Sequence, residues 1–333
     1  MKSLKVGQSI VVKSIKNEEK KSCQTLFDFL GIKGKARNCD RIFIKPNIVT
    51  LQNYKAGSIT DPLIIEELVK YIRSFSEKEI FILESESIWR TKKNIDEGRP
   101  DYNEEEQSKG FELGMESSGI NNVVSRFRNA RTLNITKAKK LPEEYVKEKT
   151  KKKFGKESEK IFPEFLGIVP EEFDCNGIYI SLSKIKSHCF QDTKVTNCLK
   201  NQYGLLSFPD KTSYHKHLSE AIKYVNMIIQ SFHDCYFITE ALRYTMEGNG
   251  PTRGTTLENL GLAVAGKNPV EVDAIAAKLM FVDPDKLDYL QLCRNVLGNY
   301  DSKELRKIPD EIRHKFRLHP EIDKLTRESL IYQ

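Results

Sequence analysis

Long hydrophobic runs are missing from this 333-residue sequence. No stretch approaches the roughly 18 uninterrupted apolar residues that suggest a transmembrane helix, so we expect no contact with a membrane. The Met1–Ile10 stretch also lacks the long apolar segment of a signal peptide. Without an export signal, a cytoplasmic location is expected. Aromatic and aliphatic residues occur throughout the chain, which excludes a wholly disordered protein.

Cysteines at metal-binding or redox spacing are missing as well. The seven cysteines are an odd number and lie far apart, and no two form a C-x-x-C pair or a ferredoxin-like run. We therefore expect reduced thiols and no intrinsic iron–sulfur cluster. Cys189 and Cys198 lie beside His188 and Lys200. We expect both to be unpaired, with the neighbouring positive charges favouring their thiolate forms.

A large excess of one charge sign is also absent. There are 54 Lys and Arg against 47 Asp and Glu, a formal net charge of +7. Much of the positive charge lies in residues 137–160, where lysines are mixed with glutamates. A run of mixed sign is typical of a solvated helix or an insertion, which argues against a nucleic-acid partner. We assign residues 90–170, approximately, to a charged insertion.

Short apolar runs separated by helical patterns are present along much of the chain. Ile42–Lys45, Ile80–Leu83 and Ile178–Leu182 have the length and composition of buried strands. Between the first two, Thr60-Asp61-Pro62 favours the start of a helix, because Pro62 fits a first turn. The order predicts an α/β fold whose mainly parallel sheet is flanked by helices, with the three runs as near neighbours.

The pattern of strands and helices divides the chain into two parts. Residues 1–300 would form the α/β core, with the charged insertion inside it, and residues 301–333 would form a C-terminal helical tail. Further strands are expected at Cys235–Ile238 and Leu260–Ala265, and further helices at His217–Phe232 and Val270–Met280.

Polar side chains follow the three predicted strands directly. In open parallel sheets, ligands bind beyond the carboxyl ends of the strands. The residues at these ends are Lys45 and Asn47 after the first strand, Glu84 after the second, and Lys184 and Lys186 after the third. Groups that leave a buried strand are held rigidly, as a binding site requires. We therefore expect them to share one cleft.

The densest polar segment is Ser181–Leu206, which contains four lysines together with His188 and Asn201. Lysine ammonium groups and asparagine amides can donate hydrogen bonds to a carboxylate or a phosphate. A histidine can exchange protons near neutral pH. The alternative is a surface turn whose lysines are only solvated.

A second segment, Met246–Gly254, contains three glycines and a proline and predicts a tight loop around Glu247. It lacks the spacing of a Walker loop. It also lacks the third glycine of the dinucleotide-binding fingerprint. Such a loop is able to let a ligand approach the backbone closely, and the alternative is a plain tight turn.

An ordered set of short motifs resembles the family known as domain of unknown function 362, some members of which are iron–sulfur proteins. The matching residues are Ile44-Lys45-Pro46-Asn47, Thr60-Asp61-Pro62, Glu84-Ser85, Leu182–His188, Val195–Asn201, Tyr203–Leu206, Glu247–Pro251 and Val272-Asp273-Ala274. They span most of the chain. The resemblance implies a fold and a site, but no reaction.

The chain departs from the family pattern in two places. Relatives usually have two glycines where this sequence has Asn197-Cys198. Asparagine tolerates left-handed backbone angles and cysteine does not, so the loop is expected to differ in shape. Relatives also often carry a ferredoxin module, for which this chain has no cysteine run.

A more distant similarity concerns the lactate racemase family. The order of His188, Lys200 and then His215 or His217 is similar to the order of histidine, lysine and histidine there. In that family the lysine tethers a nickel-pincer nucleotide, a later histidine ligates the nickel and the earlier histidine handles protons. The similarity implies His215 and His217 as candidate metal ligands, although such histidines are more often ordinary surface residues.

Three hypotheses of function follow. The first is an enzyme acting on a small anionic ligand, with His188, Glu247 and Lys200 as catalytic groups. Its substrate-binding residues would be Lys45, Asn47, Glu84, Lys184, Lys186, Asn201 and Asp273. The second is a metal-dependent enzyme related to lactate racemase. The third is a non-catalytic binding partner of an iron–sulfur protein. The cofactor, if any, is left unknown by the sequence.

Overall fold

A computed structural model describes residues 1–90, 109–188, 193–249 and 254–318. Its centre is an eight-stranded sheet in the order β1-β2-β12-β9-β6-β3-β4-β5. The five consecutive strands from β9 to β5 are mutually parallel. The α/β fold with a mainly parallel sheet is therefore confirmed.

The three predicted buried strands lie side by side. They are β3 (Arg41–Pro46), β4 (Glu79–Glu84) and β6 (Gly177–Lys184), with β3 in the middle. Their registers pair Ile42 with Ile80 on one side and with Ile178 on the other. Strands buried on both faces need continuous apolar runs, which is why these three were visible in the sequence.

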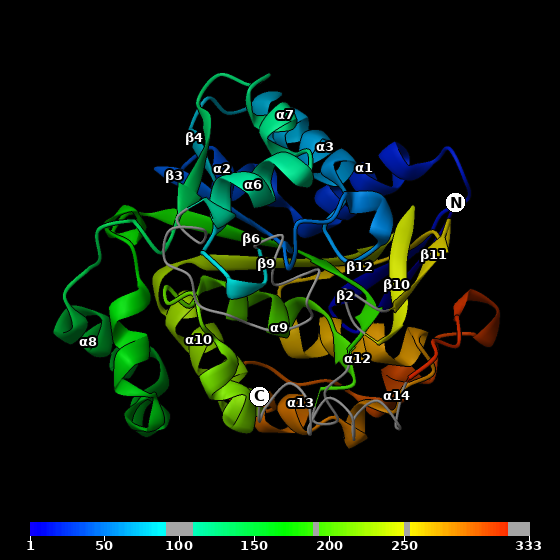
Figure 1. Cartoon of the computed structure of the whole chain (residues 1–333). Helices are drawn as coiled ribbons and strands as arrows, with labels where there is room; N and C mark the ends of the chain where they lie inside the picture. Colours follow the sequence, from blue (N-terminus) through cyan, green and yellow to red (C-terminus); the bar gives the residue numbers. More distant parts are fainter. Residues whose placement is uncertain (91–108, 189–192, 250–253, 319–333) are drawn as a thin grey trace.

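Helices cover both faces of the sheet, as Figure 1 shows. One face packs against α1 (Glu19–Leu30), α3 (Pro62–Arg73), α6 (Gly110–Ser117) and α7 (Ile120–Val124). The other packs against α9 (Cys198–Asn201), α10 (Leu218–Phe232), α12 (Pro269–Leu279) and α13 (Asp288–Cys293). Side chains alternate along each strand, so Ile42 and Ile44 belong to the first core and Phe43 to the second.

Helix α3 begins as the sequence indicates. The Asp61 side chain accepts a hydrogen bond from the Leu63 amide at 3.0 Å, and Pro62 occupies the first turn. The same carboxylate receives Arg243 at 2.6 Å. This pair ties the start of α3 to the chain that leaves β9 (Asp234–Ala241).

The far side of the sheet is antiparallel. β12 (Leu262–Gly266) runs antiparallel to β9 and to β2 (Ser9–Lys13), and β1 (Lys2–Val6) forms the edge. The described ranges also contain short helices and 3-10 turns: α2 (Ile32–Ala36), α14 (Ser302–Leu305), η1 (Tyr54–Ala56), η2 (Ile88–Arg90), η5 (Glu171–Phe173), η6 (Gln202–Leu205), η7 (Thr212–His217), η8 (Pro284–Lys286) and η9 (Asp310–Ile312).

The charged insertion is more regular than the sequence suggested. It contains α8 (Glu143–Phe154) and the turns η3 (Gly155–Lys160) and η4 (Pro163–Ile168), as expected of a helical surface segment. It also supplies β5 (Ala130–Asn134), which pairs with β4. An edge strand has one neighbour and partly exposed side chains, so its short polar sequence gave no apolar run to detect.

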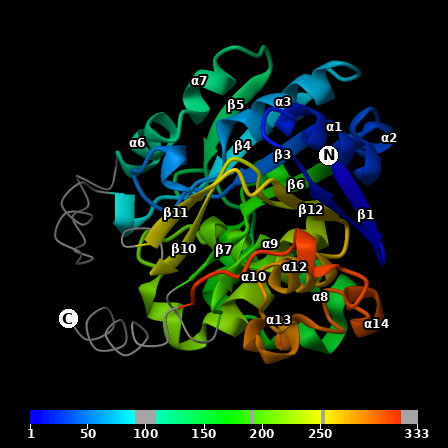
Figure 2. The ribbon, with the colours of Figure 1, turned by 90° about the vertical axis from the view of Figure 1, so that its right-hand side faces the viewer.

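The glycine-rich segment was expected to be a tight loop, but its described part forms a hairpin. β10 (Tyr244–Asn249) pairs with β11 (Gly254–Glu258), and Glu247 lies within β10. Figure 2 shows this hairpin beside β7 (Lys186–Ser187), which pairs with β8 (Val195–Thr196). The glycines at 248 and 254 lie opposite each other in the hairpin register, so both belong to the strand pairing.

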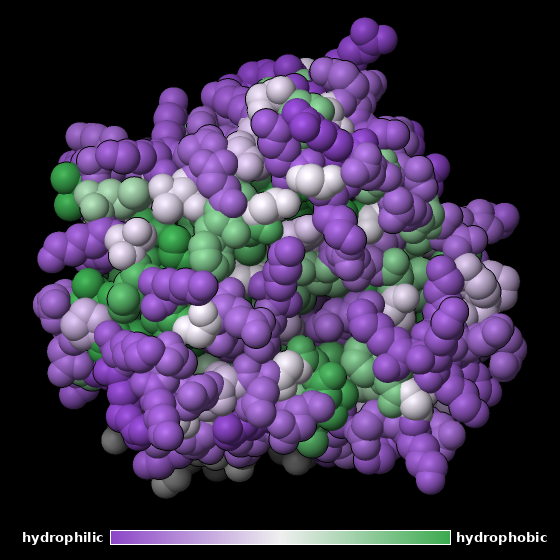
Figure 3. All heavy atoms as spheres, turned by 180° about the vertical axis from the view of Figure 1, so that it is seen from behind, coloured by the Kyte–Doolittle hydropathy of each residue, from purple (hydrophilic) through white to green (hydrophobic). Residues whose placement is uncertain are grey.

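None of the helices in the described ranges is both long enough and apolar enough to span a membrane. Figure 3 shows a face covered largely by hydrophilic residues, with hydrophobic side chains in scattered areas between them. The C-terminal tail contributes α14 and η9. Beyond η9, Phe316 is buried in the second core.

A glycine substitution tests the packing of η1 against the hairpin. Gly57 has a φ of +81°, and an added Cβ would lie 2.2 Å from the carbonyl oxygen of Thr245. We expect Gly57→Ala to lower the free energy of unfolding by about 1–3 kcal/mol through the backbone conformation, and further because Thr245 must move. Chemical denaturation measures this. Gly34→Ala is the control, since nothing lies within 4 Å of its added Cβ. Equal stability of the two variants would contradict the packing.

Candidate functional site

Three buried lysines gather at the carboxyl edge of the sheet. Lys45 is the residue before the last of β3, Lys184 is the last residue of β6, and Lys186 lies in β7. All three side chains are at most 2% exposed. Lys200, on α9, is partly exposed, and its positive charge acts on Lys186. We call Lys45, Lys184, Lys186 and Lys200 the lysine cluster.

Lys45 is paired with a carboxylate inside the protein. Its ammonium donates to Glu84 Oε2 at 2.8 Å and to the Pro46 carbonyl at 2.7 Å. Arg90 reaches the same Glu84 oxygen at 3.3 Å. Burial lowers the pKa of Lys45, and the charge of Glu84 opposes this effect. One carboxylate therefore compensates two cations.

Lys184 has a carboxylate partner on the next strand. Lys184 and Glu240 face each other in the β6–β9 register, and the ammonium lies 2.5 Å from Glu240 Oε1. It also donates to the Tyr244 carbonyl at 2.5 Å. The Glu240 carboxylate accepts from the Leu242 amide at 2.8 Å as well. The pair is completely buried, so it holds the end of β6 to β9 and to the start of the hairpin.

Lys186 differs from the other two buried lysines. Its ammonium donates to Asn47 Oδ1 at 3.0 Å and to the Ser58 carbonyl at 2.7 Å, both of which are neutral. Within the described residues it forms no ion pair with a carboxylate. Burial, and then the charges of Lys200, Lys184 and Lys45, hold the pKa of Lys186 well below its usual value. Lys186 therefore lacks the carboxylate that would favour its ammonium form.

Partly exposed basic groups surround this buried region. Burial, and next the charge of Lys200, hold the pKa of His188 well below its usual value and lower that of His215 to about 4. The Lys200 ammonium lies 5.7 Å from the ring centroid of Tyr203. Both histidines are therefore neutral at neutral pH, and a neutral imidazole can accept a proton.

Two predicted binding residues hold α9 in place. Asn201 donates from Nδ2 to the Lys45 carbonyl and to Ser181 Oγ, each at 3.0 Å. Asp273 accepts from the Cys198 amide at 2.7 Å and from the Tyr289 hydroxyl at 3.1 Å. Burial raises the pKa of Asp273 to about 6. Both residues thus position the helix that carries Lys200.

Several buried polar atoms beside the lysine cluster have no hydrogen-bond partner in the described part of the chain. They are Thr196 Oγ1, both amide atoms of Asn197 and Asn201 Oδ1. Thr196 stands directly opposite Lys186 in the β7–β8 register. Asn197 is extended, with φ −137° and ψ −147°, and does not adopt the left-handed angles that its replacement of a glycine suggested. An unpaired buried polar group costs about 1–3 kcal/mol, so these atoms favour a polar ligand.

Glu247 lies in β10 and binds the C-terminal segment. Its carboxylate accepts from the Arg317 amide at 2.8 Å and from Arg317 Nε at 2.5 Å. The Gly248 amide donates to the Arg317 carbonyl at 3.1 Å. This clamp was not visible in the sequence, because Arg317 is seventy residues away from Glu247 in a segment without a helical or strand pattern.

The candidate metal ligands lie in η7. His215 stacks near Tyr203, with ring centroids 6.4 Å apart, and His217 packs edge-on against Phe162 at 6.1 Å. Within the ranges that the structure describes, no group of three His, Cys, Asp or Glu side chains could hold a metal ion. Metal binding by these histidines stays a prediction.

The cysteine expectations divide into two. Cys198 is free, as expected, and buried at the start of α9. Burial raises the pKa of its thiol well above the usual value, and the charge of Asp273 adds to the effect. The expected thiolate is therefore wrong, because the positive charges do not outweigh burial beside a carboxylate. Cys189 lies outside the described residues.

Two further basic residues join the site that the sequence analysis did not select. Arg90, in η2, binds Glu84, and Lys211 donates to the Glu86 carbonyl at 2.6 Å. Burial lowers the pKa of Lys211 to about 7, and the charge of Arg90 contributes. At both positions the sequence pattern does not distinguish a buried basic side chain from one exposed to solvent.

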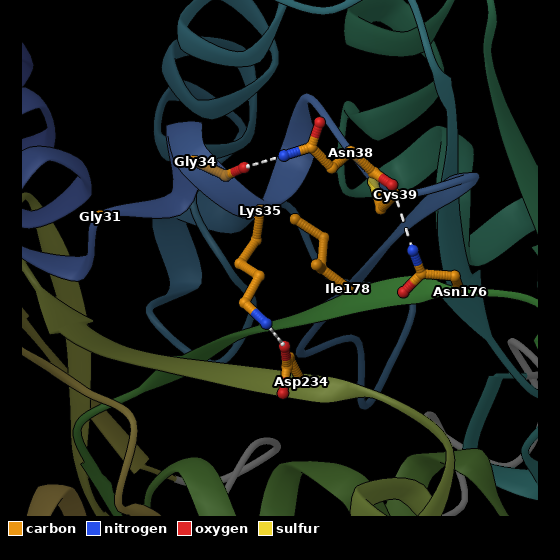
Figure 4. A pocket seen from close by; sticks show the side chains of 8 residues that line it. All are labelled: Gly31, Gly34, Lys35, Asn38, Cys39, Asn176, Ile178 and Asp234. Carbon is orange, nitrogen blue, oxygen red and sulfur yellow. Dashed lines mark hydrogen bonds and ion pairs between the residues drawn. The ribbon is translucent and has the colours of Figure 1, made fainter.

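A separate cavity of about 450 Å³ opens at the opposite, amino edge of the sheet. Figure 4 shows Lys35 reaching Asp234 across it, at 2.6 Å. Both side chains are more than half exposed. Asn38 and Asn176 hydrogen-bond to backbone carbonyls around it. Its charges are therefore paired, and none of the sequence-predicted site residues lines it.

The comparisons with known proteins give one result. The family model described as Domain of unknown function (DUF362) matches residues 42–278. The match covers more than half of the chain, which therefore belongs to this family. No curated protein and no solved structure matches the chain. The similarity to the lactate racemase family stays a prediction.

A neutral substitution tests the electrostatic role of Glu84. Glu84→Gln leaves Lys45 and Arg90 buried without their shared carboxylate, so we expect the free energy of unfolding to fall by about 3–5 kcal/mol. Urea denaturation measures the loss. Glu144→Gln is the matched control, because Glu144 is 87% exposed and its ion pair with Lys147 is on the surface. If both variants unfold at the same urea concentration, Glu84 does not stabilise the cations.

Proposed function

We propose that this member of the DUF362 family is an enzyme acting on a small anionic molecule, a carboxylate or a phosphate, at the carboxyl edge of its sheet. The observation that carries the proposal is the environment of Lys186. It is buried, it hydrogen-bonds only to neutral acceptors in the described residues, and the charges of three further lysines act on it.

The energetics of the lysine cluster support an anion. Like charges about 4 Å apart repel by roughly 1 kcal/mol in water and by more where the site is partly buried. Glu84 and Glu240 each bind a lysine, and Glu84 is also shared with Arg90. No described carboxylate pairs with Lys186. A bound anion would lower the repulsion that remains.

The polar groups near the cluster could complete such a site. The Asn197 amide and the Thr196 hydroxyl offer hydrogen-bond donors beside Lys186. Lys200 and Lys211 are partly exposed and offer ammonium groups to an incoming ligand. Carboxylates and phosphates match these donors, because hydrogen bonds between ionised partners are stronger than neutral ones.

The catalytic part of the proposal rests on His188. Its low pKa keeps the ring neutral at neutral pH, so it can accept a proton from a bound substrate. Lys200, whose charge acts on His188, can hold the anionic group of the substrate next to it. Glu247 is the weaker candidate for acid or base, since its carboxylate already binds Arg317.

Anion binding tests the proposal directly. We expect sulfate, phosphate and malonate to bind, and Lys200→Ala to weaken them about tenfold or more, because a hydrogen bond to a charged group contributes about 1.5–3 kcal/mol. Isothermal titration calorimetry measures the Kd. Lys147→Ala, on the exposed surface of α8, is the control with the same loss of charge. Equal affinities of the two variants would place the anion elsewhere.

The pH dependence of binding tests the role of Lys211. Its pKa of about 7 means that the ammonium loses its proton as the pH rises through neutrality. Sulfate keeps its charge over this range, so its affinity is expected to fall from about pH 6 to about pH 8. Lys211→Arg stays protonated and should show a smaller fall. Identical pH profiles for the two proteins would contradict a contact between Lys211 and the anion.

A further inference from the structure

The Lys186 amine has hydrogen-bond partners that suit a neutral nitrogen. Asn47 Oδ1 and the Ser58 carbonyl accept two hydrogen bonds from it, and neither acceptor is charged. Lys45 and Lys184 also make two hydrogen bonds, but each has a carboxylate among its acceptors. An ion pair favours the ammonium form, whereas neutral acceptors serve an amine equally well.

A neutral lysine with two N–H groups engaged keeps one lone pair for chemistry. Burial and neighbouring cations are the two conditions that make a lysine nucleophilic, because both disfavour the ammonium form. Lys186 meets both conditions, since it is 2% exposed and lies under the influence of Lys200, Lys184 and Lys45. Lys45 and Lys184 are buried as well, but each has a carboxylate partner that stabilises its ammonium form.

The position of the amine is also fixed from several directions. Asn47 is held through its backbone N–H, which donates to Thr60 Oγ1 at 2.7 Å. Ser58 is anchored by a side-chain hydrogen bond to Gln52 at 2.7 Å. Thr245 Oγ1 donates to the carbonyl of Ile185, the residue before Lys186. A nucleophile held in this way needs little reorganisation before it reacts.

We propose that Lys186 forms a Schiff base with the carbonyl group of an anionic aldehyde or ketone, whose carboxylate or phosphate is held by Lys200. This rests on the proposed function, because the anionic group brings the carbonyl to the amine. Lys200 and His188 are partly exposed, so solvent reaches groups that surround Lys186.

The step balances without an oxidant or a reductant. The nitrogen lone pair attacks the carbonyl carbon, and a C–N bond forms while the oxygen gains a proton. The C–O bond then breaks, and the oxygen leaves as water with both hydrogens of the amine. A C=N bond remains between substrate and lysine. His188, neutral in the protein, can transfer protons between the nitrogen and the departing oxygen.

Reductive trapping tests the proposal. The full chain is incubated with pyruvate, or separately with dihydroxyacetone phosphate, and treated with sodium borohydride, which converts the C=N bond into a stable secondary amine. Intact mass and peptide mapping then locate the adduct. We expect one adduct with at least one of the two probes, and it should lie on Lys186. No adduct with either probe, or an adduct on another lysine, overturns the proposal.

Two lysine variants test whether the adduct forms on Lys186. Lys186→Arg removes the nucleophilic amine, because a guanidinium stays protonated, so trapping should fall to background. Lys147→Arg, on the surface of α8, should be trapped like the unmodified protein. If Lys186→Arg fails to fold, peptide mapping of the unmodified protein still decides the site of attachment. Adduct formation in a folded Lys186→Arg protein would contradict the assignment.

The two proposals fail in different ways. Sulfate binding that depends on Lys200, without any trapped adduct, overturns the Schiff base and leaves the anion site intact. An adduct on Lys186 whose formation excess sulfate suppresses supports both. If sulfate neither binds nor suppresses trapping, the anion site is wrong even when Lys186 reacts.

Discussion

Burial of lysine side-chain nitrogens at the ends of adjacent strands is the constraint on which this structure depends. Each buried nitrogen needs hydrogen-bond acceptors, because an unpaired polar or charged group is expensive away from water. Lys45 obtains them from Glu84, Lys184 from Glu240, and Lys186 from Asn47 and Ser58. These contacts join β3 to β4, β6 to β9, and β7 to the segment before α3. The edge of the sheet is thereby fixed by the same side chains that make it polar.

The three buried lysines differ in whether a carboxylate compensates their positive charge. The carboxylates of Glu84 and Glu240 settle the charges of two lysines, while Lys186 has neutral partners and cationic neighbours. The proposed anion site and the proposed Schiff base both rest on this difference. Asn201 and Asp273, which the sequence placed at the ligand, instead hold α9 and with it Lys200.

The sequence could predict what depends on local pattern. Ile42–Lys45, Ile80–Leu83 and Ile178–Leu182 are continuous apolar runs, and the structure places them together in the sheet. β5 was not predicted, because an edge strand needs no continuous apolar run. Glu247 was predicted to lie in a loop because of the glycines around it, but glycines also occur in the strands of hairpins. Contacts between distant segments, such as Arg317 with Glu247 or Lys211 with Glu86, leave no periodic signal in the sequence. The sequence therefore predicted where the strands end, but not which side chains pair with each other.

The most direct measurement of the central claim is the position of an anion in crystals of the full chain. Selenate, which scatters anomalously, can be soaked into crystals and located without reference to the protein phases. The account predicts a peak within hydrogen-bonding distance of Lys200 and of at least one of Lys186, Asn197 and Lys211. A peak confined to the amino edge near Lys35, or no peak at the lysine cluster at saturating selenate, would contradict it.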